Sequence, residues 1–422
     1  MGRLITYLFS KSRSKPIALD FTFTSKKERK EITVSFNKTI FLFLICFTTN
    51  SCTEPYILET NTYEEALVVE ATITNELKKQ EITLTKTSKF EDTATQIESG
   101  ADVFIIDEIG TRYDFEEESG KYISTTEFQA VPGKEYRLNI NTNDGRSFVS
   151  STETLTPINA MQDVKASAET KDSIRGAAIR VTSFDPTNEA KYYRYEYEET
   201  YKIIAPSWNL NKAIVVPADP RNPRAEPTYA LIPNSPDTRI CYNTKKSTEI
   251  LLTSTAELND NHVDFNVRFI SNQNYIIMER YSILVRQYVE NLASYSYYST
   301  LKKLSGSGSL LSPNQPGFLY GNLRSVDNPS DKIIGYFDVT SVSTKRIYFN
   351  YIDLFPGEAP PHYYTDCTPF CYGEQPCTHK DGLIDDIGLG KVTYFGSPNW
   401  VNAPCGDCTK IGSNIKPSFW ED

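Results

Sequence analysis

Six cysteines in the second half of the chain are the residues whose type and spacing point most directly to a specific chemistry. They are Cys241, Cys367, Cys371, Cys377, Cys405 and Cys408. An even number of cysteines favours disulfide bonds where the compartment is oxidising, although six cysteines allow many pairings and the sequence does not select one. In a chain-entropy description, a bond from Cys241 to the C-terminal cysteines closes the longest loop and stabilises the fold most.

A zinc site is the alternative interpretation of the same region. Its ligands would be Cys367, Cys371, Cys377 and His379. Three thiolates and an imidazole suffice for tetrahedral zinc. We expect disulfides rather than metal, and no cofactor, because the chain carries the export signal described below. A thioredoxin-like role for Cys405 and Cys408 is weaker still, since that chemistry needs the pair at the start of a helix, which this segment does not predict.

Residues for catalysis are sparse. The sequence holds no Gly-x-Ser-x-Gly elbow, Walker loop, His-Glu-x-x-His motif or dinucleotide fingerprint. His262 falls at the start or on the polar side of an expected strand, where a structural role is usual. Asp381, Asp385 and Asp386 offer oxygen ligands for calcium, but their spacing departs from the EF-hand pattern and favours a solvated acidic turn. We therefore predict a protein that is not an enzyme.

Export is predicted by a short apolar run and the cysteine that follows it. The run from Ile40 to Phe47 has eight residues, too few for the roughly 20 that cross a bilayer as a helix, and it fits a signal peptide. We expect removal of residues 1–51 and attachment of a lipid to Cys52. An ordinary signal peptide that leaves Cys52 as a thiol is the alternative. Thr53, in place of Asp, favours the outer membrane, with the protein facing outward.

Net charge narrows the set of partners. Removing residues 1–51 takes away nine Lys/Arg and three Asp/Glu, which leaves 35 basic and 51 acidic residues in the mature chain. This acidic surface argues against nucleic acid and against unassisted binding to anionic lipid. The membrane contact would therefore be the lipid anchor itself.

The composition predicts an all-β protein with one notable helix. Tyr, Phe, Thr, Ile and Val dominate, and 23 prolines and 20 glycines interrupt the chain. We expect an immunoglobulin-like or transthyretin-like sandwich over residues 52–157, then a larger β-rich domain over 158–422 that ends in a Cys-rich segment, 357–422. The expected strands of the first domain are 66–74, 81–86, 101–106, 112–116, 121–125, 135–142 and 147–154.

Longer strands are expected in the second half. Tyr193, Tyr195 and Tyr197 alternate with charged residues, which predicts a half-buried strand. Such an aromatic row can stack sugars, but core packing explains it without a ligand and is the favoured interpretation. The segment 280–288 is apolar on both faces and predicts a central strand. Apolar residues then recur at helical spacing, which predicts a helix ending near Gly306: Leu292, Tyr295, Tyr298, Leu301 and Leu304.

A proline-rich segment, residues 206–236, is the most irregular part of the sequence. Its seven prolines argue against a regular sheet and predict a long surface loop or insertion. Long loops on rigid β scaffolds often bind partners. Trp208, Arg224 and Tyr229 are the candidate partner-binding residues, and a merely solvated loop is the alternative.

Several short motifs resemble one known family. They are Cys52-Thr53-Glu54-Pro55, the segments 67–70 and 240–242, Arg280-Tyr281-Ser282-Ile283-Leu284-Val285-Arg286-Gln287-Tyr288, Gly335-Tyr336-Phe337, Cys405-Gly406-Asp407-Cys408 and the ending 416–420. Together they are similar to the Bacteroidetes lipoprotein family called domain of unknown function 4249. The resemblance implies an outer-membrane lipoprotein that assists a TonB-dependent transporter in nutrient capture, and it supplies no catalytic residues. A structural or adhesive surface protein without a transporter partner is the alternative.

Overall fold

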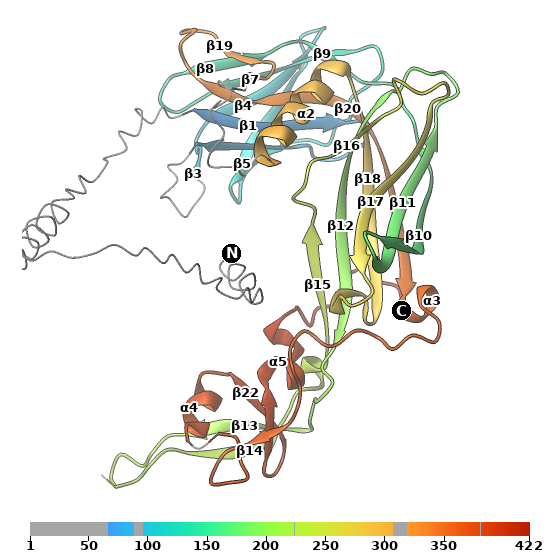
Figure 1. Ribbon diagram of the computed structural model, residues 1–422. Helices are drawn as coiled ribbons and strands as arrows, with labels where there is room; N and C mark the ends of the chain where they lie inside the picture. Colours follow the sequence, from blue (N-terminus) through green and yellow to red (C-terminus); the bar gives the residue numbers. More distant parts are fainter. Residues whose placement is uncertain (1–65, 88–95, 223, 307–318, 380) are drawn as a thin grey trace, which may run out of the picture. The chain divides into compact units, whose positions relative to one another are not determined.

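The computed structural model of the chain describes residues 66–87, 96–222, 224–306, 319–379 and 381–422. Almost all of the regular structure is β strand, and α2 (Leu292–Gly306) is the long helix (Figure 1), so the protein belongs to the all-β class predicted from composition. The predicted signal segment, residues 1–51, and the predicted lipid acceptor Cys52 lie outside the described residues.

The N-terminal strands follow the predicted pattern closely. In β7, Tyr136, Leu138 and Ile140 are buried and alternate with outward polar residues, as a strand covered on one face requires. The expected strand 147–154 is divided into two, and one short strand, β3, was not expected. The strands are β1 (Leu67–Thr74), β2 (Glu81–Lys86), β3 (Gln96–Ile97), β4 (Asp102–Asp107), β5 (Arg112–Glu118), β6 (Lys121–Ser124), β7 (Glu135–Asn141), β8 (Ser147–Ser150) and β9 (Glu153–Thr154).

Strands from the second half complete this N-terminal sheet. β19 (Leu323–Ser325) pairs with β8, and β20 (Ile333–Asn350) runs parallel to β1. The side chain of Asn322 connects these two returning strands, because it accepts the N–H of Phe337 at 2.8 Å and donates to the carbonyl of Phe337 at 3.0 Å. Leu323 of β19 and Phe337 of β20 are buried in the same hydrophobic core as the N-terminal strands. The division after residue 157 stays a prediction, and the structure adds that two later strands return to the first sandwich.

A second sandwich follows. One sheet has the order β15-β12-β18-β20 with β16 paired to β12, and the facing sheet has the order β10-β11-β17. The strands are β10 (Met161–Lys171), β11 (Ile174–Phe184), β12 (Tyr192–Ile204), β15 (Ile240–Lys246), β16 (Leu251–Ser254), β17 (His262–Ser271) and β18 (Arg280–Glu290). Two short helical turns, η2 (Tyr275–Ile277) and α3 (Tyr351–Leu354), lie in the connections.

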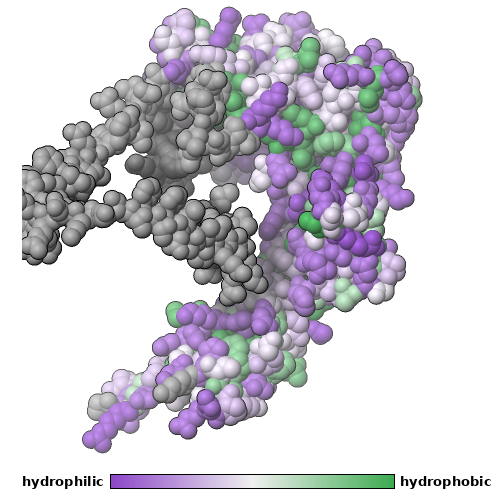
Figure 2. Space-filling view, viewed as in Figure 1, coloured by the Kyte–Doolittle hydropathy of each residue, from purple (hydrophilic) through white to green (hydrophobic). Residues whose placement is uncertain are grey.

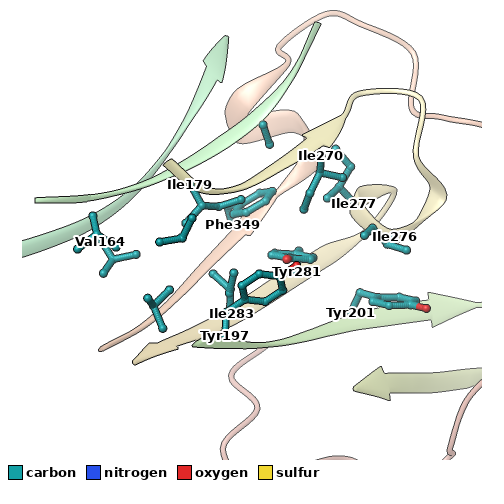
Figure 3. Close-up of a cluster of buried hydrophobic side chains, with 14 of the residues drawn as sticks. Val164, Ile179, Tyr197, Tyr201, Ile270, Ile276, Ile277, Tyr281, Ile283 and Phe349 are labelled. Atoms are coloured by element: carbon teal, nitrogen blue, oxygen red, sulfur yellow. The ribbon is translucent and has the colours of Figure 1, made fainter. Parts of the chain in front are cut away.

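The core of the second sandwich is aromatic and β-branched (Figure 3). Tyr193 and Tyr195 are fully buried there and Tyr197 nearly so, which confirms the core interpretation of the tyrosine row. β18 lies between β12 and β20, which confirms that the 280–288 strand is central.

One strand belongs to both sandwiches. The first half of β20, residues 333–340, pairs with β1, and its second half, 341–350, pairs with β18. Gly335 in the first half has φ +137°, and a Cβ there would approach the carbonyl oxygen of Val69 to 2.0 Å. A glycine is required because the two backbones are too close for a side chain.

The predicted helix is confirmed, but its buried face differs from the prediction. Leu292 is 60% exposed, whereas Ser294 and Tyr297 are buried. The cause is polar: the hydroxyls of Ser294 and Tyr298 bond to the carboxylates of Glu290 and Asp338 beneath α2. Tyr298 belongs to the predicted apolar row and is partly buried, so the buried face is shifted from that row rather than opposite to it.

The proline-rich segment is also more regular than predicted. It contains a two-stranded hairpin, β13 (Asn211–Val216) and β14 (Thr228–Pro233), followed by η1 (Pro236–Thr238). The prediction of an irregular loop was wrong because the prolines flank the strands or, as with Pro233, end one, where no ladder hydrogen bond is lost.

The Cys-rich segment forms a small sheet of its own with the order β21-β23-β22. Short helices surround it. These elements are β21 (Phe370–Cys371), α4 (Leu383–Gly388), β22 (Val392–Gly396), β23 (Asn399–Asn402), α5 (Ala403–Gly406) and η3 (Cys408–Lys410). We refer to the β13–β14 hairpin as the ribbon, and to the ribbon together with β21 to η3 as the disulfide-bonded module.

Candidate partner-binding surface on the disulfide-bonded module

The six cysteines form three disulfide bonds, as the sequence analysis favours. The pairs are Cys241–Cys408, Cys367–Cys405 and Cys371–Cys377. The zinc interpretation is wrong in this structure, because all three proposed thiolates are used in disulfides. The fourth proposed ligand, His379, packs its ring on Phe370 with centroids 4.4 Å apart.

The Cys405-x-x-Cys408 segment does not form a redox pair, since its two cysteines bond to different partners. Cys405 does lie in a helical turn, α5, which the sequence did not predict. Cys405 and Cys408 therefore do not form the dithiol pair of a redox motif, and each is part of a structural disulfide.

The ribbon and the Cys-rich segment, which are far apart in sequence, pack against each other. The backbone N–H of Ser207 donates to the carbonyl of Cys405 at 2.8 Å, and the Asn209 amide donates to the carbonyl of Phe395 at 3.0 Å. Both contacts come from the segment that leads into β13, and one of them reaches the disulfide-bonded residue Cys405. The ribbon is thus held by a cross-linked support rather than by a large core of its own.

The three predicted partner-binding residues lie at different points of this module. Trp208 is partly buried at the base of the ribbon, where its indole N–H donates to the Thr238 hydroxyl at 3.0 Å. Tyr229 packs edge-on against Trp400 with centroids 5.4 Å apart and stays 41% exposed. Arg224 is exposed near the hairpin turn and has no ion pair among the described residues. The structure therefore assigns Trp208 to support and leaves Tyr229 and Arg224 available.

Apolar side chains that the sequence analysis did not single out are exposed on both faces of the ribbon. Ile214 and Val216 lie on one face. Tyr229 and Leu231 lie on the other, because they pair across the hairpin with Val215 and Ala213. All four are about 40% exposed. The space-filling view shows apolar and polar residues side by side on the visible face (Figure 2).

Within the part of the chain that the structure describes, the ribbon is a sheet of only two strands. Each strand therefore has one backbone edge without a ladder partner, although α4 and β22 lie close to β13. Natural proteins usually cover or charge such edges, and an open edge is a ready template for another chain. The ribbon has the features of a contact surface for a protein partner.

Residues 53–346 match the family described as Domain of unknown function (DUF4249). The chain belongs to this family. The match covers more than half of the chain, including both sandwiches and the ribbon, and it ends before Cys367. No curated protein matches the chain.

The acidic turn beside the ribbon of this DUF4249 member is engaged in protein contacts. Asp386 accepts the Tyr372 hydroxyl at 2.6 Å and pairs with Lys391 at 3.4 Å, and the Tyr372 hydrogen bond is the main cause that lowers the pKa of Asp386. The described residues contain no group of three or more side chains suited to a metal ion. Asp381 and Asp385 line a cavity of about 780 Å³ with Val215 of the ribbon.

A buried charge network beneath α2 was missed from the sequence. Arg194 donates to Glu290 at 2.7 Å, and Tyr298 donates to Asp338 at 2.6 Å. Arg194 was expected on an exposed face of its strand, but the helix covers that face. The network fastens the helix to the strands beneath it. The cavities lined by Lys202, Lys171, His362 and Asp381 do not include these groups.

His262, for which the sequence favours a structural role, is exposed together with its neighbour Asp260. Its ring stacks on Phe184 at 4.7 Å, and its nitrogen lies 3.6 Å from the Asp260 carboxylate.

Among the described residues of this DUF4249 member, no helix is long and apolar enough to span a membrane.

Proposed function

We propose that this DUF4249 member is a non-catalytic, outer-membrane lipoprotein that assists a TonB-dependent transporter and contacts the barrel through the ribbon. The anchor would be a lipid on Cys52. The observation that carries the proposal is the ribbon itself, which exposes apolar side chains on both faces while disulfide-supported backbone holds its base.

The three disulfides support an oxidising, exported location, because disulfides persist outside the cytosol. The apolar side chains support a protein partner, since Ile214, Val216 and Leu231 each stay about 40% exposed and a partner that covers them would remove this apolar area from water. The barrel is proposed as that partner on the strength of the family resemblance.

The test is an affinity pulldown of the tagged lipoprotein from outer membranes solubilised in mild detergent, read by mass spectrometry. The ribbon variant is Ile214→Ser with Leu231→Ser. The matched control is Ile109→Ser with Ile158→Ser, which removes two exposed isoleucines outside the ribbon. Cys52→Ala serves as the untethered control.

We expect one TonB-dependent barrel in near-equal amount with the wild-type protein and with the matched control, and much less with the ribbon variant. Equal recovery with the ribbon variant would place the contact elsewhere. Recovery of no barrel with the wild-type protein would contradict the proposal and favour the structural or adhesive alternative.

A further inference from the structure

A second surface of the molecule has an unusual composition. A groove of about 420 Å³ lies between the β17–β18 connection and the segment that follows α3. Its lining residues are Ser271, Gln273, Asn274, Tyr275, His362 and Tyr363. The lining contains no carboxylate, lysine or arginine, although charged residues make up 23% of the chain and line each of the other three cavities described.

The aromatic part of this groove is fixed in place by the core. The Tyr275 hydroxyl lies 3.1 Å from the hydroxyl of Tyr201, which is fully buried. The next two residues, Ile276 and Ile277, are buried in the second core beside Tyr201 (Figure 3). The ring of Tyr275 is thus positioned before any ligand arrives.

The opposite side of the groove is held by the disulfide-bonded module. The Tyr363 hydroxyl donates to the carbonyl of Pro404 at 2.9 Å. The neighbouring Cys405 is bonded to Cys367, four residues after Tyr363. Both aromatic walls of the groove are therefore preorganised, which lowers the entropic cost of binding.

The polar side chains of the groove retain unused hydrogen-bonding groups. The Asn274 side-chain oxygen accepts the N–H of Ile276 at 3.2 Å, while its NH₂ group has no acceptor among the described residues. The backbone N–H of Gln273 donates to the Ser271 hydroxyl at 3.2 Å. Among the described residues, the side-chain amide of Gln273 and the imidazole of His362 make no hydrogen bond. These groups can both donate and accept, unlike a carboxylate or an ammonium group.

We infer that this groove binds a neutral carbohydrate. A sugar ring has an apolar C–H face that packs on aromatic rings, and hydroxyls that donate to and accept from amides and imidazole. An anionic ligand would lack a cationic partner in the groove, and a cationic ligand would lack a carboxylate. The volume is at the small end of the range for ligand sites, which suits a short stretch of an oligosaccharide.

This inference does not rest on the barrel partner, because the groove and the ribbon share no residues. The test uses the full mature chain with Cys52→Ala and isothermal titration calorimetry. The probes are neutral oligosaccharides of equal length from an α-glucan, a β-glucan, a xylan and a mannan, with an oligogalacturonate as the charged comparison. We expect at least one neutral probe to bind, with an affinity that changes little with salt.

The groove variant is Gln273→Ala with His362→Ala, because both side chains are exposed and neither supports the core. We expect it to weaken binding about tenfold, as the loss of two modest hydrogen bonds predicts. The control is Gln162→Ala, an exposed glutamine of the same sandwich, which should bind as the wild type does. The ribbon variant should also bind normally, so failure of the two proposals can be told apart.

Three results would overturn the inference: no binding of any neutral probe, equal binding by the groove variant, or equal binding of the oligogalacturonate. Urea unfolding of each variant establishes that it is folded. A folded groove variant that keeps full affinity would assign any observed binding to another surface.

Discussion

At the scale of single residues, two buried aspartates have pKa values shifted in opposite directions. In Asp185, burial favours the neutral form, but hydrogen bonds from Thr187 and from the backbone of Glu189 and Ala190 outweigh burial and hold the pKa below its ordinary value. In Asp338, burial first and the nearby Glu290 second raise the pKa well above its ordinary value. The two residues therefore predict opposite dependences of stability on pH.

Asp185→Asn should destabilise the fold by about 2 to 3 kcal/mol near neutral pH, because the amide turns an NH₂ group toward N–H and O–H donors. The depressed pKa means that the stabilising contribution of Asp185 is present above the unfolded value, about 3.9, and is lost as pH falls through the folded value. The difference in unfolding free energy between wild type and variant, measured in urea, should therefore shrink in acid. A variant as stable as the wild type near neutral pH would contradict this account.

Asp338→Asn should leave the protein as stable as the wild type near pH 8, or more stable by on the order of 1 kcal/mol. The raised pKa means that the folded state keeps a proton that the unfolded state releases, so wild-type stability falls as pH rises from about 4 toward the folded pKa. Asparagine mimics the protonated acid and still accepts the Tyr298 hydroxyl. Urea unfolding at about pH 5 and about pH 8 tests this, and a clear loss of stability at about pH 8 would refute it.

At the scale of elements, the strands and the helix were predictable because each has a local periodic signal. Tyr136, Leu138 and Ile140 repeat every second residue, and the bounds of α2 follow from helical spacing and a final glycine. The buried face of α2 was not predictable, because Arg194 and Asp338 come from strands far away in sequence. The same limit applies to the groove, whose Tyr275 and Tyr363 become neighbours only through the fold.

The ribbon shows a second limit of prediction from sequence. The number of prolines predicts a segment without strands, yet each proline lies outside a strand or at its end, where proline costs no ladder bond. Whether this segment can form strands depends on where its prolines lie and not on how many it contains. Which residues of the ribbon contact the Cys-rich segment could not be read from sequence, since the contact joins Asn209 to Phe395 across most of the second half.

At the scale of the whole molecule, one shared strand joins the two sandwiches, and disulfide bonds join the C-terminal segment to the second sandwich. β20 carries one hydrogen-bonded strand through both sandwiches. The C-terminal tail then closes over the edge strand β15: Tyr242 and Ser413 exchange two backbone hydrogen bonds of 2.8 Å, and Trp420 packs on Tyr242. The Cys241–Cys408 disulfide lies beside this contact and bridges 167 residues of sequence.

Loss of Cys241–Cys408 should therefore cost more than loss of a local disulfide. The pair Cys241→Ala with Cys408→Ala is expected to lower the unfolding free energy by roughly 2 to 5 kcal/mol, because the longest loop is released and two buried sulfurs are lost. The matched control is Cys371→Ser with Cys377→Ser, whose bond spans only 6 residues and should cost roughly half as much or less.

The measurement is urea unfolding combined with limited proteolysis followed by mass spectrometry. When Cys241–Cys408 is absent, the tail after residue 408 is held to β15 by non-covalent contacts, which include the Tyr242 and Ser413 hydrogen bonds, the Asn243 side-chain bond to the carbonyl of Ile411 and the packing of Trp420. We therefore expect early cleavage in the tail. The Cys371–Cys377 variant should keep its tail protected and lose protection only in the module. Equal stability and equal tail protection in both variants would show that the long cross-link does not secure the edge strand, and that the non-covalent contacts of the tail are sufficient.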